Sequence, residues 1–431
     1  MGSSGSRGAW AVIDLGFGDA GKGATTDFLC REVGADVVVR FNGGAQAGHN
    51  VVTPDGRHHT FSQLGAGTFA GARTLLGPDF LLHPLGLLLE ADHLVDVGVH
   101  DPLAMLAVHR EARVITPFQQ AANQIRERAR GDAAHGTCGV GVGECASDSL
   151  SADDTVRAGD LGDPVRLARL LRSQRDRKRV ELLSQGLDPG GIFDDPELVG
   201  RVLDVWGEVA RAVRLVDDAG LRAELDAARS VVFEGAQGVL LDEHWGFHPH
   251  TTWSDCTGST LGTLWDGPTV RLGVVRTYQT RHGAGPFPTE GTLDVPEVHN
   301  GPECWQGAFR TGALDGVLLR YALDVVGGVD GLAVTHLDRL ANGPVCTGYS
   351  GLPESFGSDR LRPGAKDDLA WREALGHALR GVRPLLETVD VRAWLTGFAP
   401  VALEAWGPTA IERRFSNGFT SRRVGRGPGS S

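Results

Sequence analysis

Lysine is scarce in this sequence. Of the 431 residues 42 are basic, but only Lys22, Lys178 and Lys366 are lysines. Acidic residues outnumber basic ones, and the formal net charge is −12. Nucleic acids and anionic membranes attract net basic surfaces, so this charge argues against both as partners. Because lysine is so rare, we expect Lys22, which lies in a glycine-rich loop, to have a function.

Long apolar runs and paired cysteines are also absent. The longest apolar stretches have the length of a strand, so no transmembrane helix is expected. Residues 1–8 are polar and glycine-rich, without the apolar run of a signal peptide, and we interpret them as a flexible leader. The absence of a C-x-x-C pair argues against a zinc knuckle or a disulfide framework and favours reduced thiols in the cytoplasm. The six cysteines are Cys30, Cys138, Cys145, Cys256, Cys304 and Cys346.

Short apolar runs alternate with helical patterns along most of the chain. Ala9–Leu15 precedes a glycine-rich loop and Ala24–Val33 reads as the helix after it, which gives a strand, loop and helix. The alternation predicts an α/β fold with a large, mostly parallel central sheet and flanking helices. The other expected strands are Asp36–Phe41, Thr74–Leu76, Ala112–Ile115, Ser230–Phe233, Val270–Val275, Leu332–Thr335 and Val391–Leu395.

We expect a single domain over residues 9–411, because neither a long linker nor an internal repeat divides the chain. The stretch at about 165–226 is rich in Arg, Glu, Leu and Ala at helical spacing and is interpreted as a helical insertion. Residues 412–431 carry several arginines among Gly, Ser and Asn. They are predicted to form a basic, flexible tail, although the arginines could also contact a phosphate.

The loop Gly16–Gly23 follows a strand and opens a helix, where free N–H groups and the helix dipole favour phosphate. Its pattern allows three interpretations. A dinucleotide fingerprint would require an acidic residue at the end of the second strand, but Arg40 ends that strand. A P-loop would require a magnesium-binding hydroxyl at the last position of the loop, which is Gly23. The third interpretation makes Asp19 distinctive, because a carboxylate beside bound phosphates can ligate magnesium or accept a proton. The alternative to all three is a tight turn with a surface aspartate.

Four further segments, together with this loop, resemble the adenylosuccinate synthetase family. Each is a long and unusual string, and they occur in the family's order along the chain. The resemblance extends from about Val12 to Pro408. The segments are FNGGAQAGH at Phe41–His49, FEGAQGVLLD at Phe233–Asp242, GAGPFPTE at Gly283–Glu290 and THLD at Thr335–Asp338.

The resemblance implies a GTP- and Mg²⁺-dependent ligase that joins the amino group of aspartate to the 6-position of inosine monophosphate (IMP). In such an enzyme GTP phosphorylates the purine 6-oxygen, and the amine then displaces phosphate. Asp19 would take the N1 proton, His49 would act as an acid as GDP leaves, and Gln237 would hydrogen-bond the 6-oxygen. Lys22 completes the implied catalytic set, and Mg²⁺ would bind the Asp19 carboxylate and the Gly48 carbonyl. The family also implies a homodimer.

The resemblance further implies how the substrates are held. Asp338 follows an apolar strand, and its carboxylate could accept hydrogen bonds from guanine N1 and N2, which would select GTP over ATP. Without the resemblance, Asp338 reads equally well as a helix cap. The implied GTP-binding residues are Gly18, Asp19, Gly21, Lys22, Gly23, Gly48, His49, Asp338 and Gly407. The implied acceptor-binding residues are Gln46, Thr137, Cys138, Gln237 and Thr252, and those for the amine are Arg310 and Thr311.

The sequence departs from the family mainly around the acceptor and the amine. The family's amine loop has paired threonines and a run of arginines, whereas Cys304–Gly312 has only Arg310. A dicarboxylate normally needs two or more charge-assisted partners. At the acceptor phosphate, Cys138 replaces a threonine, Trp253 replaces a small residue, and Ala152-Asp153 stands near the position of the arginine that crosses the family's dimer.

Because the phosphoryl-transfer residues are present while the substrate ends differ, the sequence predicts a specialised paralogue in a secondary pathway. It would activate an oxo group of IMP or a purine-like acceptor and replace it with the amino group of aspartate or a related amine. The alternatives are an ordinary housekeeping adenylosuccinate synthetase and a non-catalytic, GTP-binding regulatory homologue. A plain P-loop GTPase switch fits less well, because Gly23 lacks the hydroxyl ligand.

Overall fold

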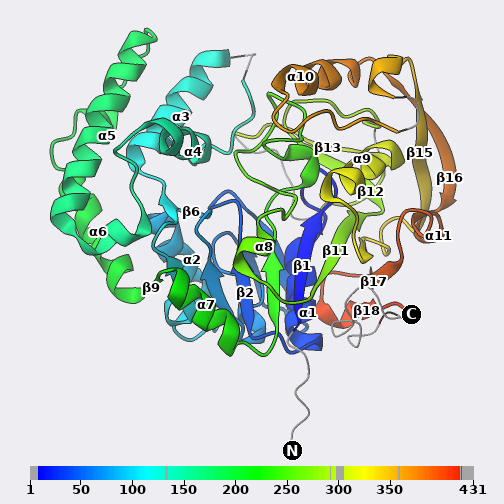
Figure 1. Ribbon diagram of the computed structural model, residues 1–431, viewed down its shortest axis with the longest axis horizontal. Helices are drawn as coiled ribbons and strands as arrows, with labels where there is room; N and C mark the ends of the chain where they lie inside the picture. The colour runs from blue at the N-terminus through cyan, green and yellow to red at the C-terminus, as the bar shows by residue number, and fades with distance from the viewer. Residues whose placement is uncertain are drawn as a thin grey trace, which may run out of the picture.

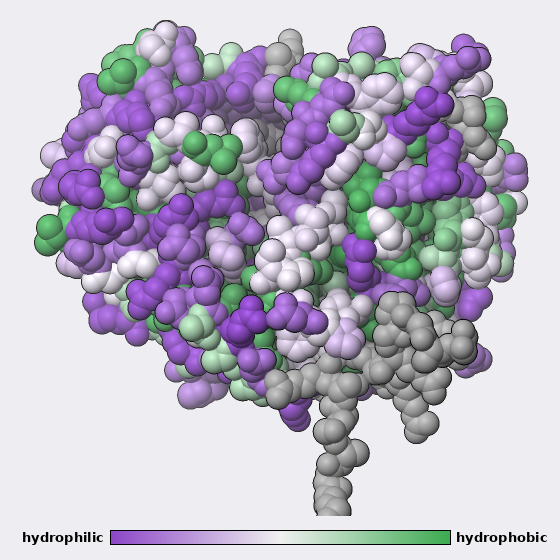
Figure 2. Space-filling view, in the orientation of Figure 1, coloured by the Kyte–Doolittle hydropathy of each residue, from purple (hydrophilic) through white to green (hydrophobic). Residues whose placement is uncertain are grey.

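The computed structural model describes residues 8–131, 134–291, 293–297, 305–357, 360–417 and 419, and the statements below refer to them. These residues form an α/β structure around a large central sheet (Figure 1). No helix in this part of the chain is long and apolar enough to cross a membrane. Hydrophilic side chains cover most of the face shown in Figure 2.

The central sheet runs in the order β18-β17-β14-β11-β1-β10-β2-β5-β7-β9. Its strand pairs are parallel, except that β18 pairs antiparallel with β17. The predicted large, mostly parallel sheet is therefore confirmed. The strands are β1 Ala9–Asp14, β2 Val37–Arg40, β5 Arg73–Leu76, β7 Leu106–His109, β9 Arg214–Val216, β10 Val231–Glu234, β11 Thr269–Arg276, β14 Gly331–Thr335, β17 Val401–Ala405 and β18 Arg413–Phe415.

Strand β1 is buried on both faces because helices cover the sheet on both sides. Ala9, Ala11 and Ile13 point into a core that includes residues of α7 and α9, whereas Trp10 and Val12 point into one that includes α1. A third core lies under α2, α3, α5 and α6. The helices are α1 Lys22–Glu32, α2 Pro84–Asp96, α3 Pro117–Arg130, α4 Val142–Ser151, α5 Pro164–Ser184, α6 Leu198–Ala212, α7 Asp218–Ala227, α8 Leu261–Leu264, α9 Gly316–Val326, α10 Leu369–Ala378 and α11 Val391–Leu395.

Smaller sheets flank the central one. A four-stranded sheet runs in the order β12-β13-β15-β16, and β15 and β16 form the edge opposite α5 and α6 in Figure 1. The pairs β3-β4 and β6-β8 make two further small sheets. The strands are β3 His49–Val52, β4 His58–Phe61, β6 Leu81–Leu82, β8 Arg113–Val114, β12 Tyr278–His282, β13 Phe309–Asp315, β15 Asn342–Ser350 and β16 Arg383–Asp390.

Two expected elements differ from the structure. Val391–Leu395 is the helix α11 and not a strand, because the Asp390 carboxylate caps the helix by accepting the Ala393 N–H at 2.9 Å. In the helix, Val391 and Leu395 lie one turn apart and both are buried. The strand expected at Ala112–Ile115 shortens to β8, which pairs with β6 outside the central sheet.

The expected domain limits also need adjustment. The stretch at 165–226 contains α5, α6 and α7, but it also supplies β9 to the edge of the central sheet. The stretch assigned to a flexible tail begins with β18, so the ordered structure continues past residue 411. Residues 1–7 of the predicted leader and residues 418 and 420–431 of the predicted tail lie outside the described residues.

Helix α1 lies so close to the start of β3 that only glycine fits at position 23. A Cβ built on Gly23 would lie 2.6 Å from the His49 Cβ and 3.0 Å from the His49 carbonyl carbon. This contact explains why the loop has no hydroxyl-bearing residue at that position. A metal-binding hydroxyl of the P-loop kind is therefore sterically excluded at this position.

We expect Gly23→Ser to destabilise the protein by about 1–3 kcal/mol, the usual cost of overpacking a core. Urea unfolding measures the change. Gly200→Ser is the matched control, because Gly200 also lies in the first turn of a helix but has nothing within 4 Å of a built Cβ. Equal stability of the two variants would contradict the steric explanation.

Candidate functional site

A cavity of about 2530 Å³ opens at the carboxyl ends of the central strands. The segments that follow β1, β2, β10 and β14 all contribute to its wall, as expected for an open α/β sheet. The predicted site residues that line it are Gly18, Asp19, Gly21, Lys22, Gly23, Gln46, Gly48, His49, Thr137, Cys138, Gln237, Thr252, Asp338 and Gly407.

Arg310 and Thr311 do not line this cavity. Both lie on β13, where the Arg310 guanidinium bonds the Glu290 carboxylate at 2.8 Å and the Gly285 carbonyl at 3.2 Å. The Thr311 hydroxyl donates to the Gly291 carbonyl. Gln306 from the same segment does line the cavity, while Cys304 lies outside the described residues. The predicted amine-binding pair therefore does not share the cavity wall with the other site residues.

A buried ion pair shapes the glycine-rich loop. The Lys22 ammonium lies 2.8 Å from the carboxylate of Asp14, and both side chains are almost fully buried. The same carboxylate accepts the N–H groups of Gly16 and Ala20. The Asp14 carboxylate thus fixes the conformation of the loop and positions Lys22 at the cavity wall. Sequence inspection missed Asp14, although a carboxylate that ends an apolar strand was a usable signal.

Asp19 lies in the middle of the loop, with a positive φ of 56°. His282 Nε2 lies 3.2 Å from Asp19 Oδ2, and the Arg276 guanidinium donates to the Asp19 carbonyl at 3.1 Å. Burial by itself would raise the pKa of Asp19, but the hydrogen bond and charge of His282, supported by the charge of Lys22, outweigh it. The pKa therefore lies below its ordinary 3.8, and the carboxylate stays ionised.

His49, the first residue of β3, is buried against Glu234, the last residue of β10. His49 Nδ1 lies 2.6 Å from Glu234 Oε1. Burial lowers the pKa of His49 from 6.5 to about 4, although the charge of Glu234 opposes the shift. Glu234 keeps its charge, because His49 and Arg40 lower its pKa more than burial raises it. The arrangement corresponds to a neutral imidazole oriented by an ionised carboxylate, which sequence inspection also missed.

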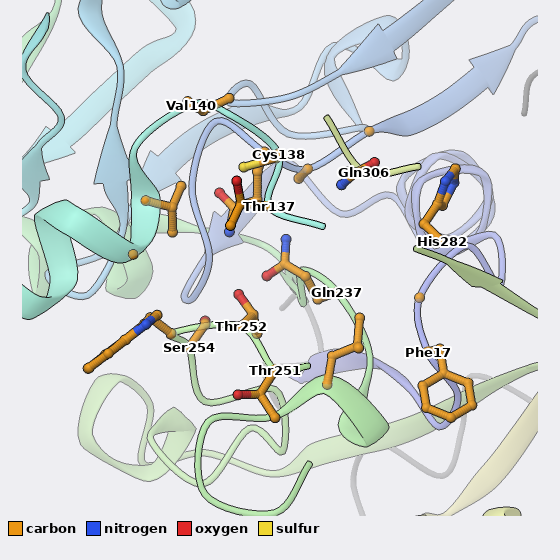
Figure 3. A pocket seen from close by; sticks show the side chains of 18 of the residues that line it. Phe17, Thr137, Cys138, Val140, Gln237, Thr251, Thr252, Ser254, His282 and Gln306 are labelled. Carbon is orange, nitrogen blue, oxygen red and sulfur yellow. The ribbon is translucent and has the colours of Figure 1, made fainter. Parts of the chain in front are cut away.

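The amides of two predicted residues are buried without partners in the described structure. They are Oε1 of Gln237 and both polar atoms of Gln46. Figure 3 shows Gln237 directed into the space between Thr137 and Thr252. A buried amide atom without a partner is costly, so these groups are suited to bind a polar ligand.

The loop after α3, where the acceptor phosphate was predicted to bind, uses its backbone donors internally. Glu127 Oε1 accepts the N–H groups of Gly136 at 2.6 Å and Thr137 at 3.1 Å. Arg130 pairs with the same carboxylate at 2.7 Å. A carboxylate of the protein therefore occupies two backbone donors of this loop.

Asp338 lies beyond β14 in the cavity wall, next to Arg339, whose Nε is 3.0 Å from Asp338 Oδ2. The alternative that Asp338 caps a helix is wrong, because a turn and then β15 follow it. Gly407, Pro408 and Arg413 line the same cavity.

Comparisons with known proteins agree with this architecture. The sequence model of the family described as adenylosuccinate synthetase matches residues 11–374. The adenylosuccinate synthetase of Anaeromyxobacter dehalogenans (strain 2CP-1) is 35% identical over 339 residues, covering 76% of this chain and 77% of that protein. That of Methylococcus capsulatus is 35% identical over 359 residues, covering 78% and 79%.

Two solved structures share the fold. The fully ligated adenylosuccinate synthetase of Plasmodium falciparum has a TM-score of 0.75 at 21% identity and covers 95% of this chain and 100% of its own. The succinoaminodeoxyadenylate synthetase of cyanophage S-2L, bound to dGMP and dATP, has a TM-score of 0.60 at 19% identity, with 95% and 96% covered. The sequence matches identify the family, and the expectation of a GTP-dependent carbon–nitrogen ligase is confirmed: the chain belongs to the adenylosuccinate synthetase family.

Proposed function

We propose that the protein is a specialised member of this family. It uses GTP and Mg²⁺ to phosphorylate an oxo group of IMP or of a purine-nucleotide-like acceptor. It then replaces that group with the amino group of aspartate or a related amine, giving adenylosuccinate or an analogue. The observation that carries the proposal is that Asp19, Lys22, His49 and Gln237 share one cavity wall, while the acceptor and amine ends depart from the family's pattern.

The loop and its neighbours fit a nucleoside triphosphate and its metal ion. Mg²⁺ is usually held by one or two carboxylates together with substrate phosphates, and the ionised Asp19 and the exposed Gly48 backbone supply such ligands. No separate group of three or more His, Cys, Asp or Glu side chains gathers elsewhere among the described residues. When bound, the ion neutralises charge on the phosphates.

The side chains divide the proton transfers between them. Asp19 accepts the N1 proton of the acceptor, so that the 6-oxygen attacks the γ-phosphorus and the bond to the β-γ bridging oxygen breaks. His49 stabilises that bridging oxygen as GDP leaves, and Glu234 orients its imidazole. The amide of Gln237 binds the 6-oxygen. The amine then attacks the 6-carbon and releases inorganic phosphate.

Three features of the acceptor and amine ends support a substrate other than the family's usual pair. Glu127 holds the backbone donors of the loop predicted to bind phosphate. The indole of Trp253 is 44% exposed and borders Gly143, with 3.2 Å between the ring and a built Cβ. Arg310, the remaining arginine of the amine loop, is paired with Glu290. The cyanophage protein, which shares the fold, was solved bound to dGMP and dATP, and this supports a change of purine nucleotide within the fold.

The second candidate is a GTP-binding regulatory homologue that transfers nothing. It would not need a base beside the phosphates, so the ionised Asp19 and the paired His49 favour the ligase.

The third candidate is an ordinary adenylosuccinate synthetase. We also expect a homodimer, since the family's sites borrow residues across the subunit interface.

Phosphate release from GTP and Mg²⁺ tests the proposal, with IMP and aspartate supplied together and each omitted in turn. We expect GTP to bind but phosphate release with this pair to be well below about 1 s⁻¹, the lower end of common turnover numbers. A panel of purine nucleotides and amines should then restore it. Turnover at a normal rate with IMP and aspartate would show an ordinary synthetase, and GTP binding without release from any pair would favour the regulatory homologue.

Asp19→Asn should abolish proton abstraction while it preserves the shape of the loop. We expect turnover of the best acceptor and amine to fall by about 10²–10⁴, the usual contribution of a general base, with GTP bound in the absence of metal within a few-fold of wild type. Asp55→Asn, at an exposed position, is the control. Undiminished turnover would exclude Asp19 as the base.

Glu234→Gln should weaken the hydrogen bond that orients the imidazole of His49. We expect kcat to fall by about 10–100-fold, in the range reported for partners that orient a functional histidine, with little change in GTP affinity. If the two residues act as a unit, the double variant Glu234→Gln/His49→Asn should be no slower than His49→Asn alone. Additive losses would show that Glu234 acts independently of His49.

A further inference from the structure

The first arginine of the basic C-terminal stretch lies at the nucleobase end of the cavity. Arg413 begins β18 and pairs with Ala405 at the end of β17. The Ala405 carbonyl also accepts the N–H of Leu337 at 3.1 Å. Arg413 is thereby brought beside the segment that carries Asp338, and both residues line the cavity together with Gly407.

The guanidinium of Arg413 is buried but incompletely bonded. Only 9% of the residue is exposed, and Nη2 donates to the Gly407 carbonyl at 3.4 Å. Nε and Nη1 have no hydrogen-bond partner in the described structure. Burial lowers the pKa of Arg413 to about 10, so the group remains charged at neutral pH. Two buried, charged N–H donors without acceptors are costly, which indicates that a ligand supplies the acceptors.

The adjacent arginine shows that this is not a general property of the strand. Arg414 points to the opposite face of β18, its side chain is 70% exposed, and it bonds the Glu404 carboxylate at 2.9 Å. Its charge is satisfied within the protein. The two neighbours therefore form a natural comparison, with one arginine directed into the cavity and the other held at the surface.

We propose that Arg413 reads the guanine base of the nucleotide donor by donating hydrogen bonds to O6 and N7, while Asp338 accepts those of N1 and N2. The proposal rests on the GTP site of the proposed function. Guanine presents two acceptors at O6 and N7, which an arginine can bond in a bidentate manner. Adenine presents an amino group in place of O6, so it would leave a buried N–H of Arg413 unpaired. Arg413 is thus a specificity-determining residue for the donor.

Nucleotide binding to the full-length protein tests this without acceptor or amine, so the result does not depend on the amination step. GTP, ITP and ATP are titrated into wild type, Arg413→Met, Arg413→Lys and Asp338→Asn, with Arg414→Met as the matched control. ITP keeps O6, N7 and N1–H but lacks the 2-amino group, and ATP lacks O6.

For Arg413→Met we expect GTP and ITP to weaken by the same factor, about 5- to 100-fold, with ATP nearly unchanged. Arg413→Lys should lose less, and Asp338→Asn should weaken GTP more than ITP. Arg414→Met should leave all three affinities as in wild type. Thermal unfolding checks that each variant is folded. If Arg413→Met does not fold, Arg413→Lys still tests the proposal.

Equal weakening of GTP and ATP would overturn the proposal, because it would place Arg413 on the phosphates or in the fold alone. Unchanged GTP affinity in both Arg413 variants would also overturn it. A wild-type protein that binds GTP selectively but releases no phosphate with any acceptor and amine of the panel would refute the ligase function and leave the base-reading role standing. A wild-type protein that binds no nucleotide would refute both.

Discussion

Three backbone segments pack against one another with no room for a methyl group, and the position of the whole site depends on this contact. A Cβ on Gly238, after β10, would lie 2.3 Å from the Gly16 carbonyl oxygen, and one on Gly23 would meet His49. The loops after β1 and β10 and the start of β3 are thus locked together. Asp19, His49 and Gln237, which lie far apart in the sequence, share one wall of the cavity because of this packing.

Within this frame, Lys22 and His49 are bonded to carboxylates of the protein, whereas amide atoms of Gln46 and Gln237 are buried without a partner. Lys22 and His49 each meet a carboxylate at the end of a neighbouring strand, Asp14 and Glu234 respectively. An unpaired charge at such depth would cost several kcal/mol, so these partners allow the reactive groups to be buried at all. Both polar atoms of the Gln46 amide and Oε1 of Gln237 lack protein partners. Burying an unpaired neutral amide costs less free energy than burying an unpaired charge, and a ligand can supply the missing hydrogen bonds. Lys22 and His49 are therefore positioned before substrate binds, and the two amides remain available to recognise it.

Much of the fold could be predicted from the sequence, because buried parallel strands appear as short apolar runs and the loop Gly16–Gly23 marks the first strand–helix crossing. The resemblance of the glycine-rich strings to the family suggested the site residues, and most of these residues line one cavity. What failed depended on tertiary contacts. An apolar pentapeptide at Val391–Leu395 fits either a strand or a helix, and the cap by Asp390 decided for the helix. The partners Asp14, Glu234, His282 and Glu127 are single polar residues without a pattern that marks them as partners, and only the packing of distant strands and loops gives them their contacts.

The departures from the family also gain a physical meaning from their positions. In the donor half of the cavity as we propose it, Lys22 and Arg276 line the wall beside the phosphates, and Arg413 lines the wall beside the base. At the acceptor end, the Glu127 carboxylate holds the loop donors and the indole of Trp253 borders Gly143 at the start of α4. A phosphorylated acceptor would have to displace Glu127 from two backbone N–H groups or draw its cation from a second subunit. A neutral or less highly charged acceptor would avoid both costs, whereas the requirement for a phosphate-binding donor half would be unchanged. The same cavity can therefore keep its phosphoryl-transfer chemistry while its acceptor changes.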